Sequence, residues 1–297
     1  TEECNSLFTQ EVWNGCQVPV PFCINPIVGQ CNCAVLEMTN YSQTTLPESF
    51  GKLSALYKLG MYTGELKRLP PSFGKSHKRL VWLNVFGTSL GTLPDDLGKL
   101  DKLLQLRVFN NRLASLPDSI GGLKRLTHFI ASGNRLKSLP KGIGNLLSLM
   151  FFDVSKNQLG SLPSSIGNLH QLKTLAIFNN TLLFLPQSIG RLSLLQIVDL
   201  RHNNLTTLPN SVSQWSNVEY FYLEGNPLCK VLELPDNFEG SKGLCDAQCS
   251  MDCPSLFLGN SVCDDNDYNF YFSSRLKPGI KPKLDSGCNT KSCQYDK

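Results

Sequence analysis

Hydrophobic residues recur along most of this chain at a nearly constant interval. Leu-Pro pairs punctuate it, beginning at Leu46, Leu69, Leu93, Leu116, Leu139, Leu162, Leu185 and Leu208. All intervals between them are 23 residues except one of 24. Between the pairs, one stretch reads LLQLRVFNNRLASLP, from Leu103 to Pro117. The regular interval predicts a coil in which each turn repeats the last.

Each turn contains two predicted elements. Around Leu106 and Val108, apolar and polar residues alternate with a period of two, which predicts a strand whose apolar side chains point inward. Strands of successive turns should pair as a parallel sheet, about 4.8 Å apart. The following LPxSIG segment is short and contains Pro and Gly, so we expect 3₁₀ or single-turn pieces on the outside. Nine such turns predict an α/β solenoid with about nine inner strands.

Asparagines mark the point where the chain bends after each strand. They stand at Asn111, Asn134, Asn157, Asn180, Asn203 and Asn226. A buried Asn at this position can satisfy backbone groups that have no strand partner. Gly64 and Thr88 replace it in two early turns, so we expect this ladder to weaken toward the N-terminal end.

The repeat resembles the leucine-rich repeat, LxxLxLxxNxL, over residues 33–228. The resemblance implies a horseshoe with a parallel inner sheet, and it favours recognition of other molecules over catalysis. The Leu-Pro-x-Ser-Ile-Gly form is similar to that of both intracellular scaffolds and extracellular repeat proteins.

Cysteines favour the extracellular group. All 12 lie toward the two ends, with none in the 195 residues between Cys33 and Cys229; they stand at Cys4, Cys16, Cys23, Cys31, Cys33, Cys229, Cys245, Cys249, Cys253, Cys263, Cys288 and Cys293. Clusters at both ends are typical of oxidised caps on a secreted solenoid, whereas a zinc site would need a matching set of histidines. We expect a cysteine-rich cap over 1–32 and another over 229–248. These segments resemble the cysteine-rich flanks of extracellular leucine-rich repeat proteins.

Residues 249–297 resemble a Lin-12/Notch repeat, a small disulfide-rich module that holds calcium. Carried over by position, the resemblance implies Asn260, Asp264 and Asp296 as calcium ligands, and their hard oxygen donors suit this ion. The sequence departs from this family at two points. A 24-residue insert, 264–287, separates Cys263 from Cys288, and the sequence ends at Lys297, before the last acidic ligand and sixth cysteine of the family.

Charge is distributed unevenly along the chain. The net charge of +4 combines −4 over residues 1–45, +10 over 46–228 and −2 over 229–297. A basic centre can favour anionic partners, although many of these Lys and Arg residues fall where the repeats turn outward and can simply be solvated. We expect no nucleic-acid partner for an oxidised extracellular protein.

The chain begins at Thr1 without a leader and contains no apolar run long enough to cross a bilayer, so we expect a processed, secreted or cell-surface protein. Sequons at Asn40, Asn179 and Asn204 are candidates for N-linked glycans.

The outward positions of the predicted strands are unusually aromatic. The candidate partner-binding residues are Tyr62, Trp82, Phe86, Arg107, Phe109, His128, Phe151, Asp153, Phe178, Asp199, Tyr220 and Tyr222. We expect these side chains to lie outside the core, on a concave inner face, where aromatic residues favour recognition.

Catalysis finds little support. His77 and His170 fall on outer segments and are expected to face solvent, whereas His128 and His202 lie on or beside the inner face. No nucleophile, phosphate loop or metal spacing accompanies them. We therefore expect a non-enzymatic protein that binds another protein. The alternatives are a structural subunit of an extracellular fibre, coat or matrix, and a sensor of glycans or small ligands.

Five cysteines at one end and seven at the other leave an odd thiol at each end. A bond between the caps would have to bridge the length of the array, which disulfide geometry forbids. We therefore predict disulfide links to further segments or chains, visible as larger species on non-reducing electrophoresis that collapse on reduction. A monomer under both conditions would contradict this; a free thiol at each end is the alternative.

Overall fold

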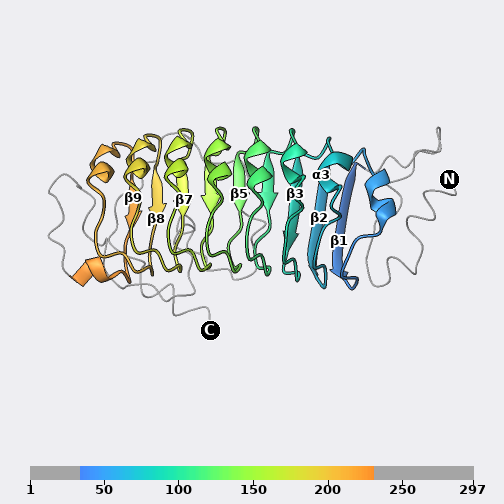
Figure 1. Ribbon diagram of the computed structural model, residues 1–297, viewed down its shortest axis with the longest axis horizontal. Helices are drawn as coiled ribbons and strands as arrows, with labels where there is room; N and C mark the ends of the chain where they lie inside the picture. Colours follow the sequence, from blue (N-terminus) through green and yellow to red (C-terminus); the bar gives the residue numbers. More distant parts are fainter. Residues whose placement is uncertain (1–33, 231–297) are drawn as a thin grey trace, which may run out of the picture.

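The computed structural model describes residues 34–230, which form one open parallel sheet of nine strands. Each strand pairs with the next, in the order β1 to β9 (Figure 1). The strands are β1 (Val35–Tyr41), β2 (Lys58–Gly64), β3 (Trp82–Phe86), β4 (Gln105–Arg107), β5 (His128–Ile130), β6 (Phe151–Asp153), β7 (Thr174–Ala176), β8 (Ile197–Asp199) and β9 (Tyr220–Tyr222). The predicted nine-turn solenoid is confirmed.

Short helices connect the strands along the outer side (Figure 1). They are η2 (Glu48–Lys52), α3 (Phe73–Ser76), η3 (Leu97–Lys99), η4 (Asp118–Gly122), η5 (Lys141–Asn145), η6 (Ser164–Asn168), η7 (Gln187–Arg191), η8 (Asn210–Gln214) and η9 (Pro227–Lys230). All are 3₁₀ except α3, which lies in the turn with the 24-residue interval.

The LPxSIG motif builds these outer turns. Pro163 precedes η6 with φ −68°, which its ring already favours, and Ile166 points into the core. Gly144 and Gly167 lie against the next turn, where an added Cβ would collide with the carbonyl oxygens of Ser165 and Ser188. Glycine therefore sets how closely the outer turns stack.

The ladder asparagines end the strands. The Asn157 side-chain amide donates to the carbonyl oxygens of Ala131, Val154 and Ser155 at 3.0, 3.1 and 3.0 Å, and its Oδ1 accepts from the Leu136 amide at 2.9 Å. One side chain thus serves two successive turns. Strands β4 to β9, in turns with this Asn, span three residues, whereas β1 and β2 span seven. The expected weakening of the ladder toward the N-terminal end is confirmed.

A residue with left-handed backbone precedes the ladder position in every turn. These residues have φ between 51° and 72° and are Asn40, Thr63, Gly87, Asn110, Gly133, Lys156, Asn179, His202 and Gly225. Asparagine and glycine tolerate this conformation best. The bend and the ladder therefore act together, because the positive φ turns the chain inward and the Asn then bonds the freed backbone.

The core is a continuous apolar stack between sheet and outer turns, in which Phe129 and Phe152 stack at 5.4 Å between ring centroids. His77 belongs to it, so the expectation that this residue faces solvent is wrong. Its ring is fully buried against Phe50 and Phe73. Nε2 lies 3.2 Å from the Phe50 carbonyl oxygen and Nδ1 lies 2.9 Å from that of Phe73, and the tautomer of a neutral ring decides which of the two accepts its one N–H. Burial lowers the pKa of His77, which favours a neutral ring.

We predict that Asn157→Ala lowers the free energy of unfolding by about 1–3 kcal/mol, because it leaves buried backbone groups of two turns without partners. Urea denaturation followed by circular dichroism measures this. The adjacent, exposed Gln158 provides the control, since Gln158→Ala should change the unfolding free energy by less than about 0.5 kcal/mol. Equal effects would show that the ladder does not carry this energy.

Candidate functional site

The outward side chains of β1 to β9 form the inner face of the sheet. Strand register aligns them in rows, one residue per turn, about 4.8 Å apart. One row runs Lys58, Trp82, Gln105, His128, Phe151, Thr174, Ile197 and Tyr220. The next row runs Glu37, Gly60, Asn84, Arg107, Ile130, Asp153, Ala176, Asp199 and Tyr222. Tyr62 pairs with Phe86 in a third row.

Close spacing makes large side chains cover one another. Seven candidate residues are half-buried on the face, namely Tyr62, Trp82, Phe86, His128, Phe151, Tyr220 and Tyr222. The other five are buried: Arg107 (4% exposed), Phe109 (1%), Asp153 (8%), Phe178 (7%) and Asp199 (0%). These five lie outside the apolar core cluster, as expected, but neighbouring side chains bury them instead of leaving them exposed to a partner. They form the floor of the face, and their neighbours form its surface.

A group that we call the N-terminal cluster occupies β2 to β4. Trp82 is its centre: Lys58 Nζ lies 4.4 Å and Arg107 Cζ 6.0 Å from the Trp82 ring centroid. Lys58 also pairs with Glu37 at 2.9 Å. Beside them, the rings of Tyr62, Phe86 and Phe109 follow one another, with centroids 5.1 and 4.6 Å apart. The cluster therefore presents half-buried aromatic surface with one accessible cation, Lys58, while Arg107 lies buried beside Trp82.

Glycine makes room for the tyrosine of this cluster. Gly60 has no side chain, and the Tyr62 ring lies over it, where an added Cβ would collide with the hydroxyl. The Tyr62 hydroxyl donates to Glu37 Oε1 at 3.3 Å. Burial, and then the charge of Glu37, raise the pKa of Tyr62, so the phenol stays protonated. Burial lowers the pKa of Arg107 to about 10, which leaves its guanidinium charged at neutral pH.

The middle of the face contains a buried carboxyl. Asp153 Oδ1 accepts from the Ser155 amide at 2.9 Å and the Ser155 hydroxyl at 2.6 Å. Burial raises the pKa of Asp153, although these bonds oppose the shift. Nearby, His128 stacks on Phe151 with ring centroids 6.0 Å apart, and burial, followed by the charge of Arg107, lowers the pKa of His128.

A second group, the C-terminal cluster, occupies β7 to β9. Arg201 donates from Nε and Nη2 to the two carboxylate oxygens of Asp199, at 2.9 and 2.8 Å. Its Cζ lies 5.6 Å from the Phe178 ring centroid and 5.4 Å from that of Tyr222. Tyr220 stacks on Tyr222 at 6.4 Å, and burial and the charge of Asp199 raise the Tyr222 pKa to about 12.

Sequence reasoning missed Arg201, although a signal was available. Arg201 lies two residues after Asp199, and therefore on the same side of an extended chain. The Asp199 carboxylate pairs with Arg201. The face offers fixed rings and hydrogen-bonding groups. Within residues 34–230, no three His, Cys, Asp or Glu side chains lie close enough to hold a metal ion.

Several predicted features lie outside the described residues. They are the Notch-like module with Asn260, Asp264 and Asp296, and every cysteine except Cys229, which is disulfide-bonded. The two caps therefore stay a prediction. Of the sequons, Asn40 and Asn204 are exposed and Asn179 is half-buried; their glycosylation also stays a prediction. Between residues 34 and 230, no helix is long and apolar enough to span a membrane.

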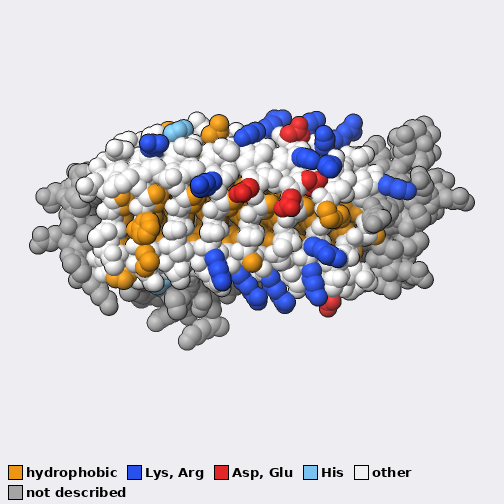
Figure 2. All heavy atoms as spheres, in the orientation of Figure 1, with side chains coloured by type: hydrophobic (Ala, Val, Ile, Leu, Met, Phe, Trp, Pro, Cys, Tyr) orange, Lys and Arg blue, Asp and Glu red, His pale blue; other side chains and the backbone are white. Residues whose placement is uncertain are grey.

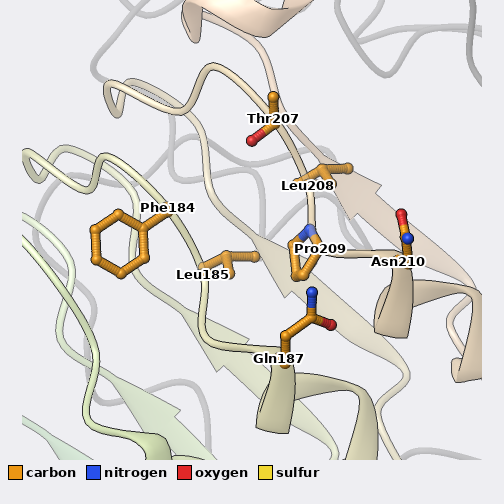
Figure 3. A pocket seen from close by; sticks show the side chains of 7 residues that line it. All are labelled: Phe184, Leu185, Gln187, Thr207, Leu208, Pro209 and Asn210. Atoms are coloured by element: carbon orange, nitrogen blue, oxygen red, sulfur yellow. The ribbon is translucent and has the colours of Figure 1, made fainter.

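A shallow hollow of about 240 Å³ lies away from the inner face, between the Leu-Pro segments of two adjacent turns (Figure 3). It is lined by Phe184, Leu185, Gln187, Thr207, Leu208, Pro209 and Asn210. The Phe184 ring is half-exposed at its rim, and no charged side chain lines it. The hollow offers a small apolar contact but no chemistry.

Comparisons with known proteins support the repeat assignment. Two models described as Leucine rich repeat match residues 170–228 and 148–169. The chain therefore contains leucine-rich repeats. None of the curated proteins is similar enough in sequence to count as a relative.

Among solved structures, the chain is similar to the LRR ectodomain of the plant membrane receptor kinase GASSHO1/SCHENGEN3 from Arabidopsis thaliana, in complex with CASPARIAN STRIP INTEGRITY FACTOR 2. The identity is 31% and the TM-score 0.57, over 65% of this chain and 24% of that chain. The chain is also similar to internalin C2 from Listeria monocytogenes, with 20% identity and a TM-score of 0.53, over 63% of this chain and 79% of that chain. For the plant peptide hormone receptor RGFR1 in complex with RGF2, the identity is 22% and the TM-score 0.52, over 64% of this chain and 35% of that chain. These two show the fold alone.

The buried carboxyl gives a test of the face's electrostatics. Because the folded-state pKa of Asp153 is raised, its protonated form is favoured by folding, and stability should fall as pH rises from about 4, the ordinary Asp value, through the raised pKa. Asp153→Asn keeps an oxygen that accepts from Ser155 but cannot ionise. We predict that the wild type loses stability relative to this variant over that interval, measured by urea denaturation at a series of pH values. A constant difference would contradict the raised pKa.

Proposed function

We propose that this leucine-rich repeat array is a non-catalytic extracellular recognition protein that binds another protein, as an extended segment, through its inner face. The observation that carries the proposal is the pair of cation–aromatic clusters at the two ends of that face. Aromatic residues and arginine are enriched at the centres of protein interfaces. Here they are already arranged in rows before any partner arrives.

Preorganisation favours binding by these clusters. Arg201 is held by both oxygens of Asp199 and lies near the rings of Phe178 and Tyr222, so its side chain loses little further freedom on binding. In the N-terminal cluster, Lys58 and Arg107 approach Trp82 in the same way. The half-buried Trp82 and Tyr220 therefore present fixed apolar surfaces beside polar groups.

The spacing of the clusters suggests the form of the partner. From Trp82 on β3 to Tyr220 on β9 there are six strand intervals, about 29 Å at 4.8 Å each. An extended chain covers this distance with about nine residues. Such a segment could contact both clusters and pass over the smaller side chains of Thr174 and Ala176 on β7.

Two further observations support an extracellular setting and recognition of a partner. The cysteines lie at the two ends of the array, and Cys229, at the last described turn, is disulfide-bonded. The similar Arabidopsis structure is a receptor ectodomain in complex with CASPARIAN STRIP INTEGRITY FACTOR 2. This chain spans 24% of that ectodomain, so we describe the partner of the present protein only by the chemistry that the inner face would recognise.

We predict that peptides selected on the full chain from a displayed random library, about 12 residues long, lose at least tenfold in affinity when Trp82→Ala and Tyr220→Ser are combined. Phe109 and Phe178 are unsuitable for this test, because they are buried and their replacement would disturb the floor of the face. Calorimetry measures the affinities, and circular dichroism verifies the fold.

The control removes exposed apolar side chains elsewhere. Leu147 and Leu194 are 56% and 38% exposed and lie near outer turns, so Leu147→Ser with Leu194→Ser should leave the affinity unchanged. If the selected peptides bind the inner-face variant as tightly as the wild type, the proposed site is wrong. If no peptide is selected and the chain instead self-associates in light scattering, the structural-subunit alternative gains support.

A further inference from the structure

A second extended surface lies beside the inner face, where each turn leaves the sheet and runs to its Leu-Pro pair. Backbone bonds align these segments: the amides of Arg112, Arg135 and Gln158 donate to the carbonyl oxygens of Leu90, Leu113 and Leu136, each at 2.9 Å. Equivalent residues therefore lie in rows across the array. We call this the side face, and it comprises 65–68, 89–92, 112–115, 135–138, 158–161, 181–184 and 204–207.

Basic side chains gather along one half of the side face and the adjoining bend. Six are exposed and form what we call the basic strip: Lys67, Arg68, Arg112, Arg135, Lys137 and Lys156. Figure 2 shows Lys and Arg side chains in a line below a band of hydrophobic ones. Glu65 is the one acidic residue on this part of the face, and none of the six basic groups forms an ion pair within residues 34–230.

The charge excess belongs to one half of the array. Residues 58–141 contain 15 basic and 5 acidic residues, whereas 142–228 contain four of each. The other acidic residues of the first half, Asp95, Asp96, Asp101 and Asp118, lie at or near the outer turns η3 and η4. The side face therefore concentrates positive charge where residues 34–230 supply almost no counter-charge.

The surface between the cations is small and polar. It consists of Ser89, Gly91, Thr92, Ala114, Ser115 and Ser138. The large exposed apolar residues of the side face, Leu183 and Phe184, belong to a later turn, outside the strip. The buried centre of a protein interface is usually more apolar than this surface. Charge, hydroxyl groups and low relief instead suit a hydrophilic polymer with repeated negative charge.

We propose that the basic strip binds an anionic polysaccharide through its sulfate or carboxylate groups. Guanidinium groups such as those of Arg112 and Arg135 bind such oxyanions with paired hydrogen bonds. From Arg68 to Lys156 the strip crosses four turn intervals, about 19 Å, which accommodates several sugar residues in line. The strip is separate from the inner face, so one chain can hold a polysaccharide and a protein segment at once.

The test measures binding of the full chain to heparin, a sulfated polysaccharide, by calorimetry at two salt concentrations. The variant combines Arg112→Gln, Arg135→Gln and Lys137→Ala. Gln158 and Ala114 hold the same rows in other turns, so the fold should tolerate these changes. We expect affinity to fall by roughly tenfold or more at low salt, with a shallower salt dependence, because three cationic contacts are lost. Circular dichroism verifies folding, and Arg135→Gln alone serves if the triple variant unfolds.

The matched control removes the same charge from the outer side, with Lys99→Gln, Lys124→Gln and Lys141→Gln. It should retain most of the affinity. Equal losses in the two triple variants would show that net charge alone binds heparin, and they would overturn the proposal. The absence of heparin binding by the wild type would do the same. Polyglutamate tests the acidic-polypeptide alternative, and if it binds as tightly as heparin the assignment to polysaccharide is wrong.

Discussion

The structure depends on the hydrogen bonds that one asparagine makes at the bend of each turn. A parallel strand that stops after three residues leaves backbone groups buried and unbonded, and this would cost more than so small a strand provides. The Asn157 side chain meets that need in its own turn and the preceding one. The left-handed residue Lys156 directs the chain toward it. Where Gly64 holds the position instead, β2 continues to pair along its length.

This constraint also determines the surfaces. Because turns repeat about every 4.8 Å, side chains wider than that spacing must lie over their neighbours. Phe86 therefore stacks on Phe109 at 4.6 Å, and Phe109 becomes buried although it points away from the core. Each row of side chains comes from the same position in every repeat. A row can consequently change in composition without disturbing the leucines that carry the fold.

Local pattern was sufficient to predict the strands, outer turns and ladder, since all three arise within one 23-residue period. The local pattern could not predict which side chains of different turns touch one another. His77 was predicted to face solvent, but its contacts Phe50 and Phe73 lie on two different turns, which the local pattern does not relate. Arg107 and Asp199 were predicted to contact a partner, but side chains of neighbouring turns bury them. The basic strip was visible only as a general charge excess, since Arg68, Arg112 and Arg135 gather when the turns stack.

The two candidate surfaces use charge in opposite ways. On the inner face, the Asp199–Arg201 pair is almost fully buried, so salt screens it weakly and its effect is to fix neighbouring rings in place. The basic strip holds exposed charges that remain available to a partner and are screened within about 8 Å at physiological salt. Buried pairs suit recognition by shape, and exposed cations suit attraction of a polymer from a distance. The repeat permits both, because each surface is a separate row on the same coil.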